Sequence, residues 1–533
     1  MLVPAGSMGH SERASFFPDH TKGSVPKYRT SGPSLVVCKS DSRRRIRRLL
    51  DGAVEQKNLS LLRRCKFEHI QAAVNAASNG TRILVLPGVY KEEPSTRVPN
   101  PDPRCQGDEF FAPEGEGDEP GGLGVTPGEE GGGARGGEPN YRYHRTCPNA
   151  QNLIAITGDD DDADRECDDK CNIQIEGTGS VPKQVRIIGD RKKLNVIRLD
   201  RADGVHLRNF QIQFSDFNNI YALETNGFRF SHITSRYSRE YGFLSFASDN
   251  GLYESLQAYG AGDSGVYPGS GPEGHCERYG IEIRDVNSYG NTIGYSGTAG
   301  NGVYAHDNRF HDNATGLTTD SFASGHPGMP QDCAKWENNR IYSNNKDLFN
   351  AEQDEYCKKP AIERDPRRVC PTFQVPVGTG LLIAGGNGNI GRNNFVYDNW
   401  RQGIALFGVP AAARGETDPT KQTDTSYDNA FTGNRMGMTP TGARDPNGVD
   451  FWWDEQGRGN CWSDNAAVAG AAITSDPPTL PSCPDSFPVA RPGNGAKQAM
   501  LVPCATWDPK DNTDPPGCAM AGYSWFERPP EPK

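Results

Sequence analysis

The sequence has few hydrophobic residues and no long hydrophobic run. Only 35% of its 533 residues are hydrophobic, and no apolar segment approaches the ~20 residues that a membrane-spanning helix needs. We therefore expect no membrane span. The opening residues, MLVPAGSMGH, also lack the apolar stretch of a signal peptide.

Excess positive charge is missing as well. The net charge is −11, which gives no reason to expect a nucleic acid or an anionic membrane as partner. Glycine (62) and proline (40) are abundant. This composition disfavours long helices and favours many short strands joined by turns.

Cysteine motifs typical of zinc sites are not found. No CxxC pair occurs, and CDDKC (167–171) has the wrong ligand context. The 14 cysteines instead suggest disulfides and an oxidising compartment. We expect a secreted or extracytoplasmic protein whose signal peptide is not in this chain; the alternative is a cytoplasmic protein with free thiols. Cysteines close in sequence could pair, leaving Cys276 and Cys333: Cys38/Cys65, Cys105/Cys147, Cys167/Cys171, Cys357/Cys370, Cys461/Cys483 and Cys504/Cys518.

After an irregular arm at 1–66, a helix followed by a strand is predicted in FEHIQAAVNAASNGTRILVLPGVYKE (67–92). Apolar residues fall on one helical face, namely Ile70, Ala73, Val74 and Ala77. The strand RILVLPGVY follows. This order resembles the N-terminal cap of right-handed parallel β-helix proteins, the pectate-lyase-like superfamily. The closest likeness is to uncharacterised secreted parallel β-helix repeat proteins of actinobacteria.

Two unusual segments come next. Residues 93–150 are rich in Gly, Glu and Pro, and we interpret them as a surface insertion. The acidic stretch GDDDDADRECDD (158–169) could hold Ca²⁺ through carboxylate oxygens. It lacks the spacing of an EF-hand loop, so a solvated acidic turn is the alternative.

From about 180 to 465 the sequence is periodic. Glycines that open successive strands lie 23, 24, 29 and 22 residues apart, at Gly204, Gly227, Gly251, Gly280 and Gly302. Such a period fits coils of three short strands; leucine-rich repeats have a similar length, but their consensus is absent. We predict an all-β fold, a right-handed parallel β-helix over 67–465. It would carry an N-terminal helical cap, irregular disulfide-rich arms and a C-terminal cap or arm at 466–533.

Asparagine recurs five residues apart, as in ENNRIYSNN (337–345). Asn tolerates left-handed backbone conformations, and identical Asn side chains stacked at the ~4.8 Å strand spacing can hydrogen-bond from coil to coil. We therefore interpret Asn339 and Asn344 as turn-building residues, with Ile341 pointing inward. The same skeleton begins at Asn308, Asn394, Asn429 and Asn460.

Alternation along the strands assigns some side chains to the surface. Glu282 and Arg284 should stack beside Tyr304 and His306 of the next coil, 22 residues later. This face could bind an extended anionic polymer, although an ordinary polar surface is the alternative. Extending the two outward columns gives His206, Arg229, Tyr253, Glu282, Tyr304 and Arg208, Ser231, Ser255, Arg284, His306.

Loop lengths suggest a site. Long loops at 268–279 and 321–333 flank the short turn SGTAG (296–300), so we expect two walls around a trough. In or beside the walls lie Asp263, Tyr267, His275, Arg278, Asp320, His326 and Asp332.

Many members of the resembled superfamily cleave acidic polysaccharides by β-elimination, and others epimerise or hydrolyse them. The resemblance therefore implies a polysaccharide lyase or C5-epimerase acting on an acidic polysaccharide or cell-wall glycan, with Ca²⁺ as the candidate cofactor. Elimination needs a cation that neutralises the uronate carboxylate and a base. We expect Arg278 as the neutraliser, His275 or His326 as the base and Tyr267 as a proton donor.

Other readings remain open. Asp320 and Asp263 could orient a histidine or bind Ca²⁺, and Asp320 with Asp332 or Asp263 could form the carboxyl pair of a hydrolase. The residues after YGF are LSF, and not the DPH triplet of alginate epimerases. A non-catalytic β-helix for glycan binding or for periplasmic metalloprotein maturation is the second hypothesis. We expect a monomer.

Overall fold

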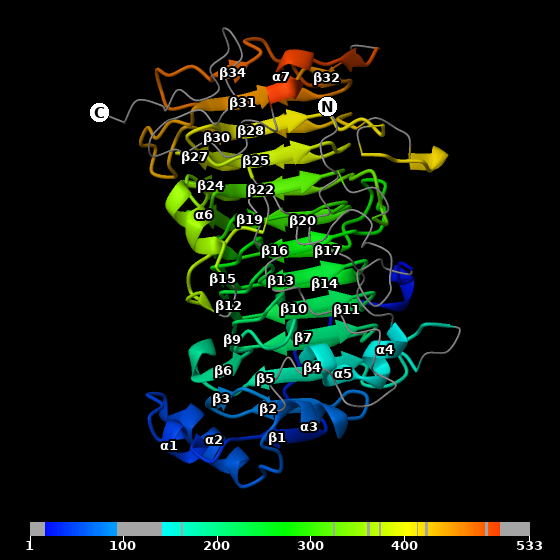
Figure 1. Ribbon diagram of the computed structural model, residues 1–533, viewed down its shortest axis with the longest axis vertical. Helices are drawn as coiled ribbons and strands as arrows, with labels where there is room; N and C mark the ends of the chain where they lie inside the picture. The colour runs from blue at the N-terminus through cyan, green and yellow to red at the C-terminus, as the bar shows by residue number, and fades with distance from the viewer. Residues whose placement is uncertain are drawn as a thin grey trace.

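The computed structural model describes residues 16–92, 141–160, 164–322, 326–359, 363–372, 375–412, 414–421, 425–485 and 489–500. In these ranges the chain winds into a stack of coils whose strands form three long, all-parallel sheets of 12, 11 and 10 strands (Figure 1). We call them sheets A, C and B. This is the parallel β-helix predicted from the sequence. Two further strands, β32 (Gln456–Gly457) and β35 (Arg491–Pro492), pair antiparallel.

Each complete coil gives one strand to each sheet, and the coils at the ends of the stack lack one or two. Sheet A contains β1 (Ser34–Val37), β2 (Arg82–Val85), β5 (Gln174–Gly177), β8 (Val205–Arg208), β11 (Asn226–Ser231), β14 (Asp249–Glu254), β17 (Ile281–Arg284), β20 (Val303–His306), β23 (Lys335–Glu337), β26 (Ile390–Arg392), β29 (Ala430–Thr432) and β33 (Cys461–Ser463). Sheet B contains β3 (Gly88–Tyr90), β6 (Val185–Ile188), β9 (Gln211–Gln213), β12 (Thr234–Arg236), β15 (Gln257–Tyr259), β18 (Asn287–Tyr289), β21 (Arg309–His311), β24 (Arg340–Tyr342), β27 (Phe395–Tyr397) and β30 (Arg435–Met436). Sheet C contains β4 (Asn152–Thr157), β7 (Asn195–Asp200), β10 (Asn218–Leu223), β13 (Phe243–Phe246), β16 (Ser264–Gly269), β19 (Ile293–Tyr295), β22 (Thr315–Asp320), β25 (Thr379–Ala384), β28 (Gln402–Phe407), β31 (Val449–Trp453) and β34 (Ser475–Asp476).

Helices are short and lie outside the coils. They are α1 (Ser42–Ile46), α2 (Gly52–Leu62), α3 (Ile70–Asn75), α4 (Tyr141–Thr146), α5 (Pro148–Gln151), α6 (Ala351–Cys357) and α7 (Gly495–Met500). The predicted helical cap is α3, which buries Ile70, Ala73 and Val74 against the first coils. None of the helices in the described part of the chain is long and apolar enough to span a membrane.

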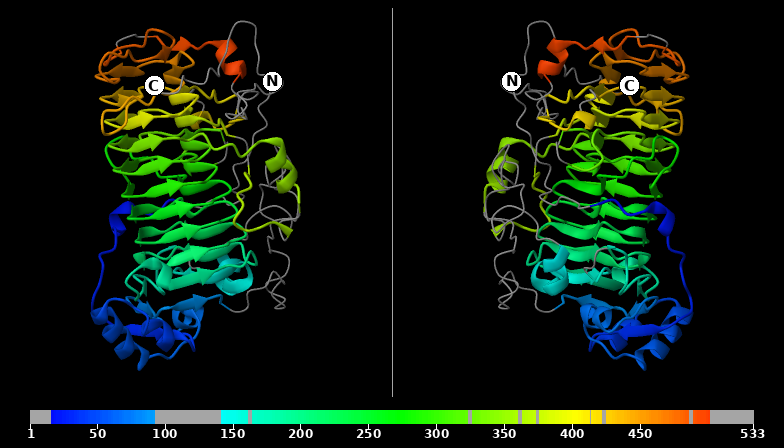
Figure 2. Two further views of the ribbon diagram at one scale, coloured as in Figure 1. Left: turned by 90° about the vertical axis from the view of Figure 1, so that its left-hand side faces the viewer. Right: turned by 90° about the vertical axis from the view of Figure 1, so that its right-hand side faces the viewer.

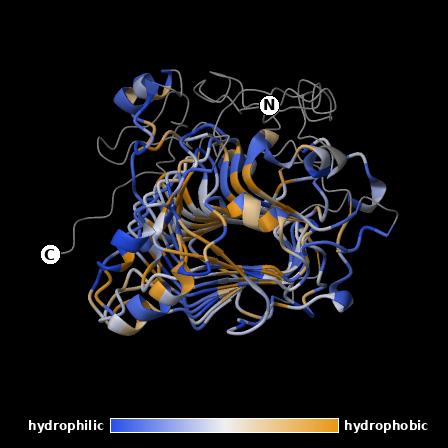
Figure 3. Cartoon of the chain, turned by 90° about the horizontal axis from the view of Figure 1, so that it is seen from below, coloured by the Kyte–Doolittle hydropathy of each residue, from blue (hydrophilic) through white to orange (hydrophobic). Residues whose placement is uncertain are grey.

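The hydrophobic core lies inside the coils. Figure 3, a view along the stack, shows the coils superimposed around this interior. Inward side chains stack from coil to coil because the strands are in register. Trp336 is fully buried, and its neighbours in the stack are Ala305 on one side and Gly391 on the other. Small residues beside a large one keep the volume of the interior constant.

The described part of the predicted arm, residues 16–66, is more regular than the sequence suggested. Its strand β1 pairs with β2, so sheet A begins before residue 67. Residues 16–33 run along the outside of the stack (Figure 2), where Asn250 donates to the carbonyl of His20 (2.9 Å) and Asn226 to that of Asp19 (2.7 Å).

Five disulfides join described residues, and four of them are pairs expected from sequence proximity: Cys38–Cys65, Cys167–Cys171, Cys357–Cys370 and Cys461–Cys483. The fifth joins the two remaining cysteines, Cys276 and Cys333. The expected pairs Cys105/Cys147 and Cys504/Cys518 include residues outside the described ranges, as does most of the insertion 93–150.

The predicted asparagine ladder is confirmed. Each side-chain amide donates to the side-chain oxygen of the Asn one coil further on, for example Asn308 to Asn339 (3.0 Å) and Asn339 to Asn394 (3.1 Å). A parallel ladder starts at Asn291, and a third joins Asn389, Asn429 and Asn460.

The ladder asparagines do not themselves adopt the left-handed backbone conformation that we expected of them. The left-handed residue at each corner is the one before the ladder asparagine, as at Asn338 (φ 56°) and Ser343 (φ 53°). Asn339 itself acts through its side-chain amide, which the corner holds buried.

Candidate functional site

The two long loops expected to form the walls of a trough meet each other. Asn301, directly after the short turn between them, donates to the carbonyl of Gly271 in one loop (3.0 Å) and of Gly328 in the other (2.6 Å). Residues 296–300, the expected floor, are all buried. The predicted trough is closed, because both loops pack onto the short turn.

Four of the predicted site residues lie on the outer face of sheet C or at its edge, and all are buried. Tyr267 is on β16, Asp263 precedes that strand and Asp320 ends β22. His326 packs edge-on against Phe246 of β13, with ring centroids 5.4 Å apart. Their exposed fractions are at most 5%.

Burial shifts the pKa values of the two carboxyls, Asp263 and Asp320. Loss of solvent raises the pKa of Asp263 to about 7 and that of Asp320 to about 6. Asp320 accepts hydrogen bonds from Thr298 Oγ1 (2.7 Å) and from the Phe322 amide (3.1 Å). These carboxyls exchange protons near neutral pH, but a polymer in solution does not reach them in this structure.

The remaining predicted catalytic residues lie in the loop that follows β16. His275 is exposed and close to Asp332, whose pKa burial raises to about 6 with a further contribution from Glu273. Arg278 makes two hydrogen bonds to the carboxylate of Asp249, at 2.7 and 2.5 Å. Asp249 is buried, and its carboxylate already neutralises the guanidinium that we expected to neutralise a substrate.

The predicted surface residues form a compact cluster on the outer face of sheet A. Glu282 pairs with Tyr304 and Arg284 with His306, as expected from the 22-residue offset. One oxygen of Glu282 accepts from Arg284 Nη1 (2.7 Å) and lies 3.1 Å from His306 Nε2. The rings of Tyr304 and His306 stack at 4.3 Å. We call these four residues the sheet A cluster.

Two members of the predicted columns are wrong. The outward positions on β14 are Leu252 and Glu254, whereas Tyr253 is fully buried in the core. Ser255 lies beyond the end of the strand. The error comes from Gly251, which is paired one residue away from the position that aligning the strand-opening glycines assumed.

Sequence reasoning missed the groups that surround the cluster. Glu254 Oε1 accepts from Arg284 Nη2 (2.7 Å), and Glu337 Oε2 accepts from the Tyr304 hydroxyl (2.7 Å). Lys335 and Arg392 both pair with Glu337. The alternation in KWE (335–337) and IGR (390–392) could have placed Lys335, Glu337 and Arg392 on the outer face. Insertions of several lengths between these coils, however, hid which residues pair with which.

The charges of these groups at neutral pH are fixed. Although burial acts to raise it, hydrogen bonds from Lys335, Tyr304 and Arg392 hold the pKa of Glu337 at about 2. Burial and the bond to Glu337 raise the pKa of Tyr304 to about 12. Tyr304 is therefore a neutral phenol beside a carboxylate.

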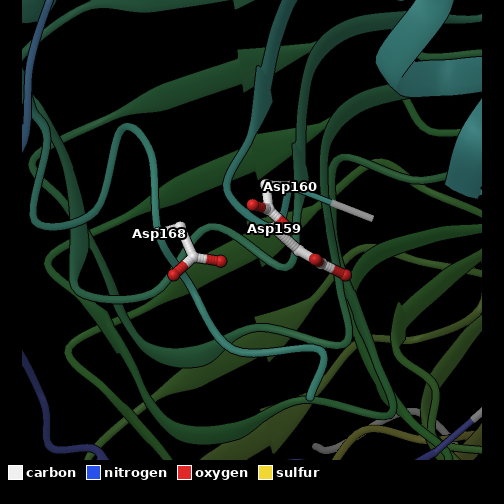
Figure 4. A group of neighbouring side chains, drawn as sticks. All are labelled: Asp159, Asp160 and Asp168. Atoms are coloured by element: carbon white, nitrogen blue, oxygen red, sulfur yellow. The ribbon is translucent and has the colours of Figure 1, made fainter. Parts of the chain in front are cut away.

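The acidic stretch places three carboxylates together. Oxygens of Asp159, Asp160 and Asp168 lie within 4.8 Å of one another (Figure 4), and all three residues belong to the connection between β4 and β5. Asp159 also pairs with Arg201 Nη1 (2.6 Å), so part of its charge is neutralised within the protein. Carboxylate oxygens are ligands that Ca²⁺ prefers. The Ca²⁺ site expected in this stretch therefore stays a prediction, and these three aspartates are its candidate ligands.

No protein-family model matches the sequence. No curated protein matches it either. Among solved structures, the chain is similar to the A-module of the mannuronan C-5 epimerase AlgE4 of Azotobacter vinelandii, with a TM-score of 0.40 and 12% identity over 76% of this chain and 91% of that one. It is also similar to the pectate lyase Pel9A, with a TM-score of 0.33 and 12% identity over 89% and 84% of the two chains. Similarity at this level assigns no residue of the site.

Proposed function

We propose that this protein acts outside the cytoplasm on an acidic polysaccharide and cleaves it by β-elimination at the sheet A cluster. One observation carries the proposal: Arg284, Tyr304 and His306 lie side by side on a partly exposed face of adjacent strands. They are the cation, the proton donor and the base that elimination from a uronate requires. Disulfides favour an oxidising compartment.

Each residue has a defined role in the reaction. Arg284 binds the uronate carboxylate and so acidifies the C5 proton, which His306 removes. The C5–H electrons form the C4–C5 double bond as the C4–O bond breaks. The departing glycosidic oxygen takes a proton from Tyr304, and the proton held by His306 then passes to the Tyr304 oxygen, directly or through water, which restores both residues. The net products are an unsaturated sugar and a new chain end.

The flat face favours a lyase over an epimerase. Tyr304 and His306 project from the same side of β20, since they are two residues apart in one strand. Both groups therefore meet the same face of a sugar ring lying on the sheet. Syn elimination needs a base and an acid on one face, whereas epimerisation needs a proton delivered to the opposite face.

Glu282 shows that the cluster accommodates a carboxylate. One of its oxygens contacts both Arg284 and His306, and its side chain is 35% exposed. A uronate carboxylate can take this position if Glu282 swings into solvent.

A second function, glycan binding without catalysis, is favoured by the same contacts. His306 Nδ1 lies 2.7 Å from Asp307 and Nε2 lies 3.1 Å from Glu282, so both ring nitrogens already have partners. Such a network is also what a stable polar binding surface requires.

The experiment is a lyase assay on pectate, alginate and glycosaminoglycans, with and without Ca²⁺, followed by ultraviolet absorbance of the unsaturated product. We expect product from the wild type and its loss in His306→Gln. His311→Gln is the matched control, because His311 has similar partners, Asp312 and Asn287, on sheet B. Binding with no product supports the second function. Exchange of the C5 proton with deuterium but no cleavage identifies an epimerase. Full activity in His306→Gln excludes the sheet A cluster.

A further inference from the structure

A basic pocket lies between the end of α1 and the outer face of sheet B. Figure 1 shows α1 and β6 near the N-terminal end of the stack. Its volume is ≈ 450 Å³, within the ~300–1,000 Å³ range of small-molecule sites. It is lined by Arg45, Arg48, Leu49, Pro87, Lys183, Gln184, Arg186, Gln211 and Arg236. We call this the cap pocket.

The cap pocket gathers positive charge that the protein does not neutralise. Its lining has five basic residues and no acidic one, although the whole chain carries a net charge of −11. Arg45 pairs with Asp41 (2.7 Å). Within the described part of the chain, the other basic side chains of the pocket form no ion pair: Arg48, Lys183, Arg186 and Arg236.

Three arginines of sheet A are neutralised within the protein. Arg229, Arg284 and Arg392 each bind a glutamate on a neighbouring strand. Like charges held close together repel each other and oppose folding. An unneutralised group of cations in a concave site therefore indicates an anionic ligand, since the ligand removes this repulsion when it binds.

The strand register brings these side chains together. Arg186 of β6 pairs with Gln211 of β9, and Arg236 of β12 follows on the same face. Part of the Arg236 guanidinium, the Nε atom, is buried with no hydrogen-bond partner. Its cation lies 4.8 Å from the ring of Tyr259, which fixes the direction of the side chain.

The uncharged lining residues indicate which groups of the ligand, besides its anionic ones, the pocket can contact. Gln184 and Gln211 offer amide groups that suit hydroxyls, and Leu49 and Pro87 offer an apolar wall for the face of a sugar ring. The lining has no His, Asp, Glu, Tyr or Cys, and its one lysine, Lys183, is exposed to solvent, so no buried base or activated nucleophile faces the ligand. We propose that the cap pocket binds the carboxylate or sulfate groups of an acidic oligosaccharide and does not transform it.

This site is independent of the proposed lyase site in its residues. The cap pocket is on sheet B and the sheet A cluster on sheet A, so they share only the class of ligand that the proposed function assumes. Either can fail while the other holds: the cap pocket is tested by binding and the cluster by product formation.

The test is isothermal titration of the full chain with trigalacturonate, a heparin-derived tetrasaccharide, neutral maltotriose and inorganic phosphate. The key variant is Arg48→Glu/Arg186→Glu. The matched control is Arg43→Glu/Arg63→Glu, which changes the net charge equally at exposed residues of α1 and of the end of α2, outside the pocket. All titrations are repeated with Arg284→Gln to remove binding at the sheet A cluster. Lys183→Gln, at an exposed residue, is a single change that leaves packing intact.

We expect an anionic oligosaccharide to bind the wild type, with affinity reduced by about tenfold or more in Arg48→Glu/Arg186→Glu and by less than about twofold in the control. Lys183→Gln should weaken binding severalfold without lowering the Tm. The proposal is overturned if the double variant binds as the wild type does, or if no anionic oligosaccharide binds. Equal affinity for maltotriose, or for phosphate, also overturns it.

Discussion

At the scale of single residues, the corners of the coils use two neighbouring positions for two tasks. A residue with positive φ makes the bend, and the next residue, an asparagine, joins its coil to the adjacent ones. The side-chain amide of Asn339 makes four hydrogen bonds. Its oxygen accepts from the backbone and side-chain amides of Asn308, and its nitrogen donates to Asn394 Oδ1 and Ala305 O. The ladder is therefore a buried network with every amide hydrogen bonded at this position.

Replacing Asn339 by Ala should destabilise the protein strongly. The change leaves several buried donors and acceptors without partners, and each costs about 1–3 kcal/mol. We expect a loss of roughly 3 kcal/mol or more in the free energy of unfolding, measured by urea denaturation. Asn338→Gly is the control, because Asn338 is exposed and its φ of 56° suits glycine. Equal effects of the two changes would show that the ladder contributes nothing.

The buried carboxyl of Asp263 should make stability depend on pH. Its folded-state pKa is about 7, above the unfolded value of about 3.9, so the folded state binds the proton more tightly. Its contribution is fully present below pH ~4 and is lost as the pH rises to about 7. Asp263→Asn should therefore shrink the fall in Tm between pH 5 and pH 8, whereas Asp285→Asn, at an exposed residue, should not. An unchanged fall in Asp263→Asn would contradict the assigned pKa.

At the scale of strands, the sequence predicted what is local and missed what depends on register. The repeated Asn and Gly positions disclose the coils because each coil needs its own corner. The pairing of Glu282 with Tyr304 was predictable because no insertion separates their coils. The closed trough was not, because Asn301 joins two loops whose meeting depends on their three-dimensional course. The cap pocket was equally hidden, since α1 and β6 are far apart in sequence.

Gly251 tests the corrected register of β14. A Cβ at this position would lie 2.2 Å from Phe228 Cζ and 2.7 Å from Ile281 Cδ1. Gly251→Ala should therefore lower the free energy of unfolding by about 1–3 kcal/mol through overpacking, and Phe228→Leu should restore part of it. Gly52→Ala is the control, because nothing lies within 4 Å of the added atom. An outward Gly251, as the glycine alignment implied, would tolerate alanine.

Glu282 tests the idea that the sheet A cluster holds a carboxylate of its own in place of a ligand. Glu282→Gln removes the charge that competes for Arg284 and His306. We expect the affinity for trigalacturonate to rise by about threefold to tenfold at low salt, and the gain to fade as salt screens the charges. Glu355→Gln, an exposed charge on α6, should change the affinity little. A loss of affinity in Glu282→Gln would mean that Glu282 binds the ligand itself.

At the scale of the whole molecule, each coil contacts mainly its two neighbours, so stability is distributed along the stack. The segment 16–33 is an exception, because it runs past several coils from Asn250 to Gln174 (Figure 2). Arg29 anchors its far end: its backbone exchanges hydrogen bonds with the Gln174 side chain (2.9 and 3.0 Å), and its guanidinium donates to Gly80 O (2.5 Å).

Removing this anchor should loosen the nearby coils and leave distant ones unchanged. We expect Tyr28→Ala/Arg29→Ala to raise hydrogen–deuterium exchange in β2 and β5, because Tyr28 also donates to Glu176 of β5 (2.9 Å). Exchange in β25 and β28, many coils away, should stay at the wild-type rate. Lys27→Ala is the control at an exposed neighbouring residue. A uniform rise along the stack would show that the coils open together, and that the arm stabilises the molecule as one cooperative unit instead of coil by coil.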